Sequence, residues 1–330
     1  MKRIFFTLLV LGVFAGMSSC RKDADKDIDI RAYDEQQIQA YIKSNGLTGF
    51  ARDLTGGDTS GIYYKIIKQG TGAVLDYPDM VSLVFTIKSF DGQYLKQDTM
   101  INHIYNFLGH VDKVRYANIP YGVQSAIKNI LKNKGTTARV LLPSRLAYGR
   151  SGFGSGSSES SGRVAGNQSL ELYINVINDA ETNVIDQSTG KKLTGQDVYD
   201  DMVVANYIAN NNLTGFQKTN SGLWYKITQP GNGSTITPFM SVNIQWTETL
   251  LNGLRTGNEF NNETGTGYPF DLSVDARRGV VEGLQFASPG AKLTLLMPTR
   301  LMYKYATSSN LNVPVLSCIR YDINVISFVE

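Results

Sequence analysis

The chain is poor in the side chains that most enzymes use for acid–base, nucleophilic or metal chemistry. Its 330 residues include two histidines, His103 and His110, and two cysteines, Cys20 and Cys318. General acid–base catalysis relies most often on histidine, and zinc sites draw on histidine and cysteine ligands. The composition therefore counts against most hydrolases and metal enzymes, and we expect no metal and no cofactor.

Cys20 stands at the end of a segment that is typical of an export signal. Lys2 and Arg3 form a short basic region, an uncharged apolar run follows at 4–14, and small residues lead to Cys20. The run is too short to cross a bilayer as a helix, which takes about 20 residues, and the layout is that of a signal peptide. A cysteine at this point resembles a lipobox. We therefore expect a lipoprotein signal peptide over 1–19 and an acylated Cys20, with a plain signal peptide and an incidental cysteine as the alternative.

The residues after Cys20 are charged and poor in apolar surface, so we expect a lipid-anchored tether over 20–32. Arg21 is not an inner-membrane retention signal of the aspartate type, which favours the outer membrane, on its periplasmic or cell-surface face. Cys318 has no second cysteine to pair with in the mature chain. It lies in an alternating apolar stretch, so we expect it to be a small buried hydrophobe.

Length and composition favour two β-rich domains. The formal net charge is only +3, and no basic face indicates a nucleic-acid partner. We also expect the protein to be a monomer. The chain contains 32 glycines and 18 tyrosines, which favours short strands and turns over helices.

The sequence repeats itself. YIKSNGLTGF at 41–50 returns as YIANNNLTGF at 207–216, and SGIYYKIIKQGTG at 60–72 returns as SGLWYKITQPGNG at 221–233. Two pairs of similar segments in the same order indicate a duplication. We expect a first domain over 33–180, a polar linker over 181–192 and a second domain over 193–330, with the joint open to proteases.

Each repeat is expected to begin with a helix and to continue as strands. Asp34 is the expected cap of the first helix, and apolar residues recur at helical spacing in both: Ile38, Tyr41 and Ile42 in the first, and Val198, Met202 and Ala205 in the second, at 197–208. Period-two alternation predicts strands at 81–87 and 242–247, each followed by a hairpin turn. Later strands at 138–142 and 292–297 end at a proline, and closing strands follow at 170–177 and 319–328. The fold class is therefore α+β, dominated by antiparallel sheet.

Several motifs resemble the FKBP-type peptidyl-prolyl isomerase family. Leu-Ala-Tyr-Gly at 146–149 follows Pro143, and Leu-Met-Tyr at 301–303 follows Pro298. The segment at 279–284 and the pair Val313-Pro314 match the family's helix and the element before its last strand in spacing. The resemblance implies two tandem FKBP-like domains, each an antiparallel sheet wrapped on a short helix and preceded by an N-terminal helix. With its tether, the chain looks like tandem FKBP-like lipoproteins of the Bacteroidetes type.

The resemblance implies that the protein catalyses rotation about X–Pro bonds. Amide resonance makes the uncatalysed barrier about 18–20 kcal/mol. The planar amide is more dipolar than the twisted transition state, so a dry apolar pocket shaped for the twisted form favours that state. A hydroxyl donor can hold a substrate carbonyl, and neither a nucleophile nor a metal is required.

The resemblance also assigns a pocket to each domain. Tyr303 and Tyr148 would supply the hydroxyl donors. The second-domain pocket would consist of Trp246, Phe260, Phe270, Val280, Tyr303, Val313 and Tyr321. The first-domain pocket would consist of Phe85, Leu95, Tyr105, Val123, Tyr148, Val164 and Leu172, of which we interpret Leu95 and Leu172 as core.

The sequence departs from the family pattern at the first hairpin. Strongly active members carry Phe-Asp there, whereas this chain has Leu95-Lys96 and Phe260-Asn261, so both carboxylates are missing. We therefore expect weak isomerase activity, mainly in the second domain, on proline-containing or unfolded exported polypeptides. Two alternatives stay open: a non-catalytic FKBP-fold lipoprotein that binds peptides as a chaperone or adhesin, and a carbohydrate-capture lipoprotein with exposed aromatic residues.

Overall fold

The computed structural model describes residues 29–100, 102–114, 118–154, 162–261, 265–304 and 313–329. The expected signal peptide at 1–19, Cys20 and most of the tether lie outside these ranges. Within the described ranges, no helix has both the length and the hydrophobicity that crossing a bilayer requires.

The first domain is built on a seven-stranded antiparallel sheet with the order β1-β2-β6-β7-β3-β4, in which β5 also pairs with β3. Its elements are α2 (Ile30–Ser44), β1 (Ala51–Arg52), α3 (Thr55–Asp58), β2 (Tyr63–Lys68), β3 (Met80–Ser89), β4 (Leu95–Lys96), β5 (His103–Phe107), η2 (Leu108–Lys113), α4 (Gly122–Ala126), the π-helical turn η3 (Ile127–Leu131), β6 (Thr137–Leu142), η4 (Ser144–Leu146), η5 (Gly149–Ser151) and β7 (Leu170–Ile177).

The second domain repeats this architecture with a six-stranded antiparallel sheet of the order β10-β11-β14-β15-β12-β13. Its elements are α5 (Gly195–Asn210), β10 (Gln217–Lys218), β11 (Trp224–Gln229), β12 (Ser241–Leu250), β13 (Tyr268–Asp271), α6 (Arg278–Leu284), β14 (Lys292–Met297), η6 (Thr299–Leu301) and β15 (Ile319–Phe328). A separate hairpin of β8 (Glu181–Ile185) and β9 (Lys192–Thr194) links the two domains, in the interval predicted to be a polar linker.

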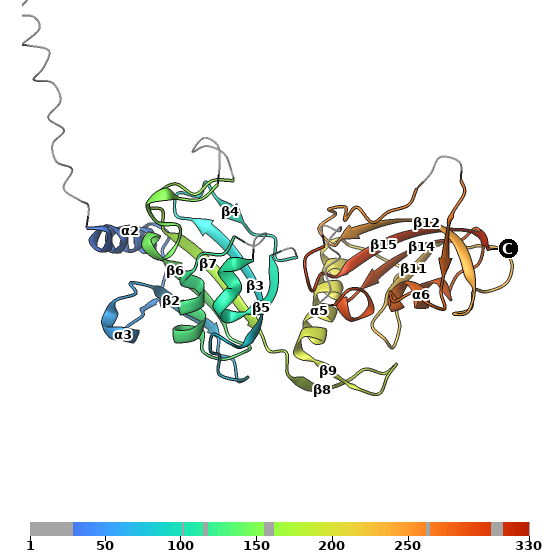
Figure 1. Cartoon of the computed structure of the whole chain (residues 1–330), viewed down its shortest axis with the longest axis horizontal. Coiled ribbons are helices and arrows are strands. Elements are labelled where there is room, and N and C mark those ends of the chain that lie inside the picture. The colour runs from blue at the N-terminus through green and yellow to red at the C-terminus, as the bar shows by residue number, and fades with distance from the viewer. Residues whose placement is uncertain are drawn as a thin grey trace, which may run out of the picture.

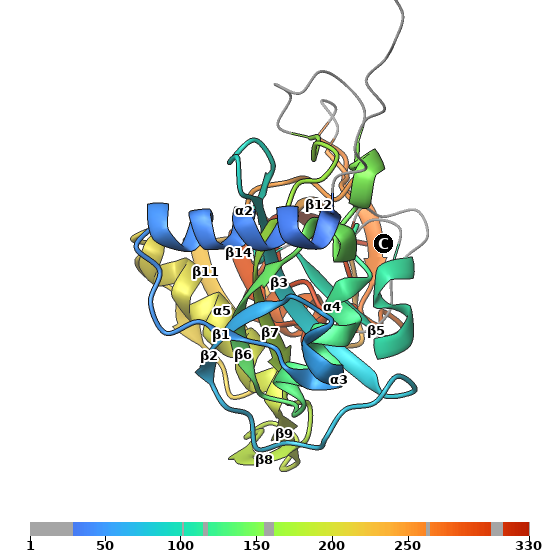
Figure 2. The same cartoon turned by 90° about the vertical axis from the view of Figure 1, so that its left-hand side faces the viewer.

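Figure 1 shows the two sheets side by side with α5 between them, whereas α2 lies on the outer side of the first domain (Figure 1 and Figure 2). Each domain has its own hydrophobic core, in which α4 and η3, or α6, pack against the sheet. The structure therefore confirms the predicted α+β fold class with two antiparallel-sheet domains. The long strands β3, β6, β7, β12, β14 and β15 lie where alternation and the closing prolines predicted them.

The predicted helix cap at Asp34 is wrong. Helix α2 begins after Asp29, whose carboxylate accepts hydrogen bonds from the first backbone amides of the helix. Asp34 lies one turn inside the helix and is fully buried. Its carboxylate accepts from the backbone N–H of Ser144 at 3.0 Å and from Arg145 Nη1 at 3.0 Å, and Arg145 Nη2 donates to the Ser60 carbonyl at 2.6 Å. Asp34 thus fastens α2 to the turn that follows Pro143.

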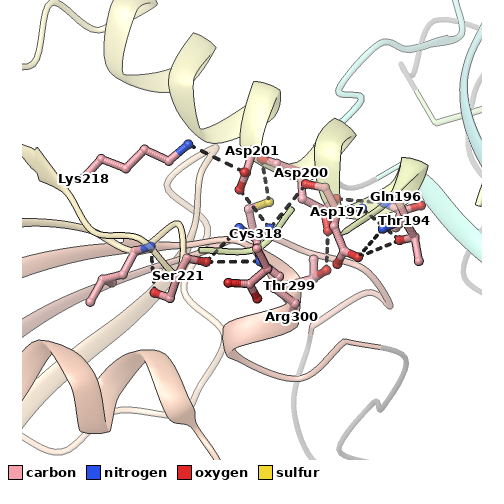
Figure 3. A network of polar contacts seen from close by, with 12 residues as sticks. Thr194, Gln196, Asp197, Asp200, Asp201, Lys218, Ser221, Thr299, Arg300 and Cys318 are labelled. Atoms are coloured by element: carbon pink, nitrogen blue, oxygen red, sulfur yellow. Dashed lines mark hydrogen bonds and ion pairs between the residues drawn. The ribbon is translucent and has the colours of Figure 1, made fainter. Parts of the chain in front are cut away.

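We call this attachment of a helix to the turn after the closing proline the dock. In the second domain, two acids, Asp200 and Asp201 of α5, form the corresponding dock (Figure 3). Asp200 precedes Tyr207 by the same interval as Asp34 precedes Tyr41. Asp200 accepts a hydrogen bond from the Thr299 hydroxyl, while the adjacent Asp201 pairs with Arg300 at 2.9 Å. Arg300 Nη2 donates to the Ser221 carbonyl at 2.8 Å, as Arg145 does to Ser60. The duplication therefore preserved the dock but moved the ion pair by one residue.

This dock explains why the predicted apolar face of the second helix is wrong. Val198 and Ala205 are exposed, and Met202 is 47 % exposed. The buried face of α5 instead carries Gln196, Asp197, Asp200 and Val204. Polar side chains can occupy a buried helix face when each has a hydrogen-bond partner, and the hydrophobic period then misleads.

Gln196 also connects the two domains. Its side-chain carbonyl accepts a hydrogen bond from the Ser82 hydroxyl of β3 at 2.6 Å, and its amide donates to Asp200 at 2.7 Å. His103 Nε2 lies 2.8 Å from the same Ser82 hydroxyl, and burial lowers the pKa of His103 to about 3. A neutral, buried hydrogen-bond chain therefore runs from the first sheet into the dock of the second. Cys318, predicted to be a buried hydrophobe, is indeed buried, in the small core under α5.

Candidate functional site

Two strands and a loop of the second domain bring four aromatic side chains together. Trp246 points inward from β12, and its backbone exchanges two hydrogen bonds, of 2.9 and 3.0 Å, with Phe260. The Trp246 and Phe260 rings have centroids 5.9 Å apart and planes inclined by 27°. Phe270 and Tyr268 of β13 meet Trp246 at steep angles, with centroids 6.3 and 5.9 Å away. These four rings form an aromatic wall, in edge-to-face and stacked arrangements that aromatic pairs favour.

Beside the wall, two tyrosine hydroxyls meet a buried carboxylate. Tyr303 donates to Glu248 Oε2 at 2.8 Å, and Tyr321 donates to the same oxygen at 2.5 Å. Asn258 Nδ2 also reaches Glu248 Oε2, at 2.6 Å, and lies 3.0 Å from both hydroxyls. We call Glu248, Asn258, Tyr303 and Tyr321 the polar edge of the site.

Sequence analysis missed Glu248, although a signal was present. Val242, Ile244 and Trp246 predict an inward face with a period of two, and Glu248 is the next residue on that face. The structure buries it completely, in register with Tyr321 across β12 and β15. A charged residue that continues the apolar face of a strand is a candidate functional group, because a buried charge is unfavourable without partners.

Arg277 contacts both the polar edge, through Tyr321, and the aromatic wall, through Phe270. Arg277 Nη1 donates to the Tyr321 hydroxyl at 3.2 Å, and its guanidinium lies 4.6 Å from the Phe270 centroid. Both Asp275 oxygens bind the same guanidinium, at 3.0 and 2.6 Å. Burial, followed by the charge of Glu248, raises the pKa of Tyr303 to about 12 and raises that of Tyr321 further. Both tyrosines therefore keep their protons at neutral pH and act as hydrogen-bond donors.

The structure brings together all seven residues predicted for this site. Val280 of α6 and Val313, before β15, are buried in the same core cluster as Trp246, Phe270 and Tyr321, and Phe260 and Tyr303 pack against it. Tyr303 was predicted to donate its hydroxyl proton to a substrate carbonyl. In the structure it donates this single proton to Glu248 instead. Asn261, which stands in place of the family's carboxylate, donates to the Thr247 hydroxyl at 3.1 Å.

The first domain arranges different residues at the corresponding place. Phe85 is buried in the core, and Lys96 Nζ lies 5.2 Å from its ring centroid. Tyr148 donates to the Asn118 carbonyl at 2.5 Å, and its ring stacks on Phe153 at 5.0 Å. Burial lowers the pKa of Lys96 and raises that of Tyr148. Phe153 lies in the segment between η5 and β7 and was not predicted, although it is an aromatic residue between two glycines.

Two further predictions for the first domain are wrong. Leu172 is buried in the core as expected, and Val123 and Val164, which were predicted to line the pocket, are buried in the same core cluster. Tyr105 pairs with Ser82, so it lies on the sheet face opposite to Phe85, and its neighbour Ile104 fills the core instead. A slip of one residue along a strand moves a side chain to the other face. Leu95, interpreted as core, is 48 % exposed because β4 is a two-residue edge strand.

The residues described by the structure include no cluster of three or more histidine, cysteine, aspartate or glutamate side chains placed to hold a metal ion. The site is thus an aromatic wall with a polar edge. Trp246 and Phe270 are buried, whereas Phe260 and Tyr303 are half-buried and Tyr268 is exposed, so solvent reaches the site at these three rings.

The chain is similar to known proteins over part of its length. No protein-family model matches the chain. The chain is 32 % identical over 126 residues to the FKBP-type peptidyl-prolyl cis-trans isomerase FkpA of Buchnera aphidicola subsp. Acyrthosiphon pisum, covering 38 % of this chain and 50 % of that protein. It is 30 % identical over 109 residues to a probable FKBP-type peptidyl-prolyl cis-trans isomerase of Haemophilus influenzae, covering 33 % and 43 %. The chain therefore matches about half the length of these curated relatives.

Solved structures of the same class are similar at low identity. The alignment with the structure of the three FKBP domains of wheat FKBP73 covers 86 % of this chain and 99 % of the wheat chain, with 16 % identity and a TM-score of 0.31. FkpA from Escherichia coli covers 40 % and 60 %, with 23 % identity and a TM-score of 0.33. In sequence, the chain is thus similar to FKBP-type peptidyl-prolyl cis-trans isomerases over about half of their length.

Proposed function

We propose that the chain is a weak FKBP-type peptidyl-prolyl cis-trans isomerase whose working site lies in the second domain. The observation that carries this proposal is the wall of Trp246, Phe260 and Phe270 beside the tyrosines of the polar edge. The sequence similarity to FKBP-type isomerases supports the same reaction. A proline ring packed on the wall would place its imide bond at the boundary between apolar and polar groups.

Such a site lowers the rotational barrier through its shape and its polarity. The twisted imide is less dipolar than the planar one, so an apolar wall destabilises the ground state relative to the transition state. Tyr303 would bind the substrate carbonyl only by redirecting its proton away from Glu248. This competition supports the proposal that the activity is weak.

The same observation favours a second candidate function, a non-catalytic module that binds extended polypeptide. Both predicted hydroxyl donors are engaged within the protein, Tyr303 with Glu248 and Tyr148 with the Asn118 carbonyl. A site whose donors are already occupied can still bind an apolar ring. It would then protect unfolded chains without speeding rotation.

One pair of measurements on the full mature chain separates the two functions. We expect substoichiometric protein to accelerate the cis-to-trans relaxation of a short X–Pro peptide, followed by protease coupling or by NMR exchange. In parallel, the same preparation is tested for suppression of aggregation of an unfolded proline-containing protein. Suppression without any acceleration of relaxation would favour the binding module and contradict the isomerase.

We also propose that the protein is an outer-membrane lipoprotein, anchored through Cys20, that acts on exported polypeptides. The basic pair, the apolar run and the small residues before Cys20 support this anchor. Cys20→Ala should abolish incorporation of a labelled fatty acid and release the protein from the membrane fraction. Membrane retention without lipid label in both forms would contradict the proposal.

A further inference from the structure

Glu248 occupies a position that the fold itself fills with an apolar residue. In the second sheet, Trp246 pairs with Ile323 and Glu248 with Tyr321. In the first sheet, the matched pairs are Phe85 with Ile174 and Ile87 with Leu172. Ile87 and Leu172 are buried and belong to a continuous apolar core. The carboxylate is therefore not needed to build the sheet, and a reason for it must be sought in the site.

The contacts of Glu248 are one-sided. Tyr303, Tyr321 and Asn258 all donate to Oε2. Oε1 is buried and has no hydrogen-bond partner in the part of the chain that the structure describes. A buried acceptor without a donor is unfavourable, and a carboxylate oxygen more so than a neutral one. If Glu248 served only to hold the tyrosines, a single acceptor atom would suffice.

The nearby Arg277 does not supply the missing hydrogen bond to Oε1. Arg277 lies near the polar edge, but both oxygens of Asp275 bind its guanidinium. It reaches the polar edge only through the Tyr321 hydroxyl, to which it donates at 3.2 Å. Oε1 is therefore a buried acceptor without a donor among the described residues, and the group that would complement it is a hydrogen-bond donor.

We infer that Glu248 Oε1 accepts a hydrogen bond from the backbone N–H of the residue that follows proline in the bound polypeptide. This inference rests on the proposed function and specifies its substrate. Proline has no N–H of its own, so the donor must come from a neighbouring residue. During isomerisation the residue before proline swings around the imide bond, whereas the following N–H stays attached to the side held against the aromatic wall.

A hydrogen bond to the part of the substrate that does not rotate is kept in both isomers and in the transition state. Such uniform binding lowers KM without raising kcat. Glu248 is therefore a binding and positioning residue, and it confers a preference for substrates whose next residue after proline carries an N–H. An X–Pro–Pro segment lacks that N–H and should bind poorly.

The test compares two probes on the full mature chain by titration calorimetry and NMR exchange. One probe is the peptide Ala-Leu-Pro-Phe, and the other is its depsipeptide, in which an ester oxygen replaces the N–H after proline. We expect the wild type to bind the peptide about tenfold more tightly than the depsipeptide, the value of one hydrogen bond to a charged group. The difference should reside in KM, with kcat unchanged.

Glu248→Gln tests the assignment without changing the shape of the side chain. The glutamine carbonyl must accept from the tyrosines, so its amide would occupy the place of Oε1 and face the peptide N–H as a second donor. We expect peptide affinity to fall about tenfold while depsipeptide affinity stays within about twofold. Ile87→Val, at the matched position of the first domain, should leave the preference unchanged.

Equal preference in the wild type and Glu248→Gln would overturn the inference while leaving the isomerase proposal intact. If neither probe binds the wild type, both fail. Should Glu248→Gln not fold, a peptide labelled with ¹⁵N at the residue after proline decides the question on the wild-type protein. Its amide proton should move downfield on binding, and an unshifted amide in a saturated complex would contradict the inference.

Discussion

The two domains share a sheet order and a helix dock, but matched positions carry different chemistry. In the first domain, Ile87 faces Leu172 and the ring of Phe85 lies near the Lys96 ammonium. In the second, Glu248 faces Tyr321 and carries a hydrogen-bonded polar edge. The same strand positions thus serve as plain core in one copy and line the candidate site in the other. Duplication preserved the fold, and function has to be inferred from the residues that line each copy.

The docks differ as well, and this difference gives the largest expected effect on stability. Burial raises the pKa of Asp200 from 3.8 to about 7, although hydrogen bonds from Thr299 and Gln196 oppose the shift. Between about pH 4 and pH 7 the folded state therefore holds a proton that the unfolded state has released, so the free energy of unfolding falls as pH rises.

Asp200→Asn should remove this pH dependence. The variant should match the wild type near pH 4 and exceed it at pH 8 by up to about 4 kcal/mol. Both tryptophans of the chain lie in the second domain, so denaturant titrations followed by tryptophan fluorescence report its unfolding. A slope between pH 4 and pH 7 that persists in Asp200→Asn would show that Asp200 is not the group responsible.

The corresponding substitution in the first domain should act in the opposite direction. Asp34 is buried and pairs with Arg145, so Asp34→Asn leaves a half-buried guanidinium without its counter-charge. Breaking such a pair costs about 3 kcal/mol or more. Hydrogen exchange of the α2 and β6 amides at pH 8 measures the loss, with Asp29→Asn at the exposed cap as the control. Equal responses to Asp34→Asn and Asp200→Asn would contradict the difference between the docks.

The aromatic residues give the largest expected effect on activity. Trp246→Leu should lower kcat/KM for X–Pro isomerisation about 100-fold, because it removes the centre of the wall and misplaces the proline. Phe85→Leu makes the matched change in the first domain and should leave activity within about twofold. Both variants are compared as full chains, with circular dichroism to verify folding. A larger loss in Phe85→Leu would move the working site to the first domain.

The tyrosines at the edge of each site give a smaller contrast. Tyr303→Phe removes one donor from Glu248 and should lower kcat/KM about tenfold, the value of one hydrogen bond to a charged group. Tyr148→Phe removes only a hydrogen bond to the Asn118 carbonyl and should not change the rate. If the two variants behave alike in the isomerisation assay, the polar edge is not what distinguishes the domains.

Much of the fold could be predicted from the sequence because its signals are local. Alternation such as Val81, Leu83 and Phe85 predicted the central strands, and Pro143 and Pro298 marked where β6 and β14 end. The buried helix faces could not be predicted, since Asp34 and Asp200 resemble solvent-facing residues until their partners, far along the chain, are known.

The candidate site, too, could be predicted only in part from the sequence. The wall residues Trp246, Phe260 and Phe270 came from resemblance to family motifs, and the structure brings them together. Glu248 replaces no expected residue, so motif comparison passed over it. Tyr105 was misassigned because a single step of register separates the two faces of a strand.

The central claim, that proline-containing polypeptide binds in the second domain, has a direct test in the two indole N–H signals of the chain. Trp246 Nε1 donates to the Asn258 carbonyl at 3.0 Å within the site, whereas Trp224 lies in the small core under α5. In an NMR titration of the full chain with Ala-Leu-Pro-Phe, we predict that the Trp246 indole signal shifts saturably while the Trp224 signal stays in place. A saturable shift of the Tyr148 and Phe153 signals with an unchanged Trp246 indole would contradict the account.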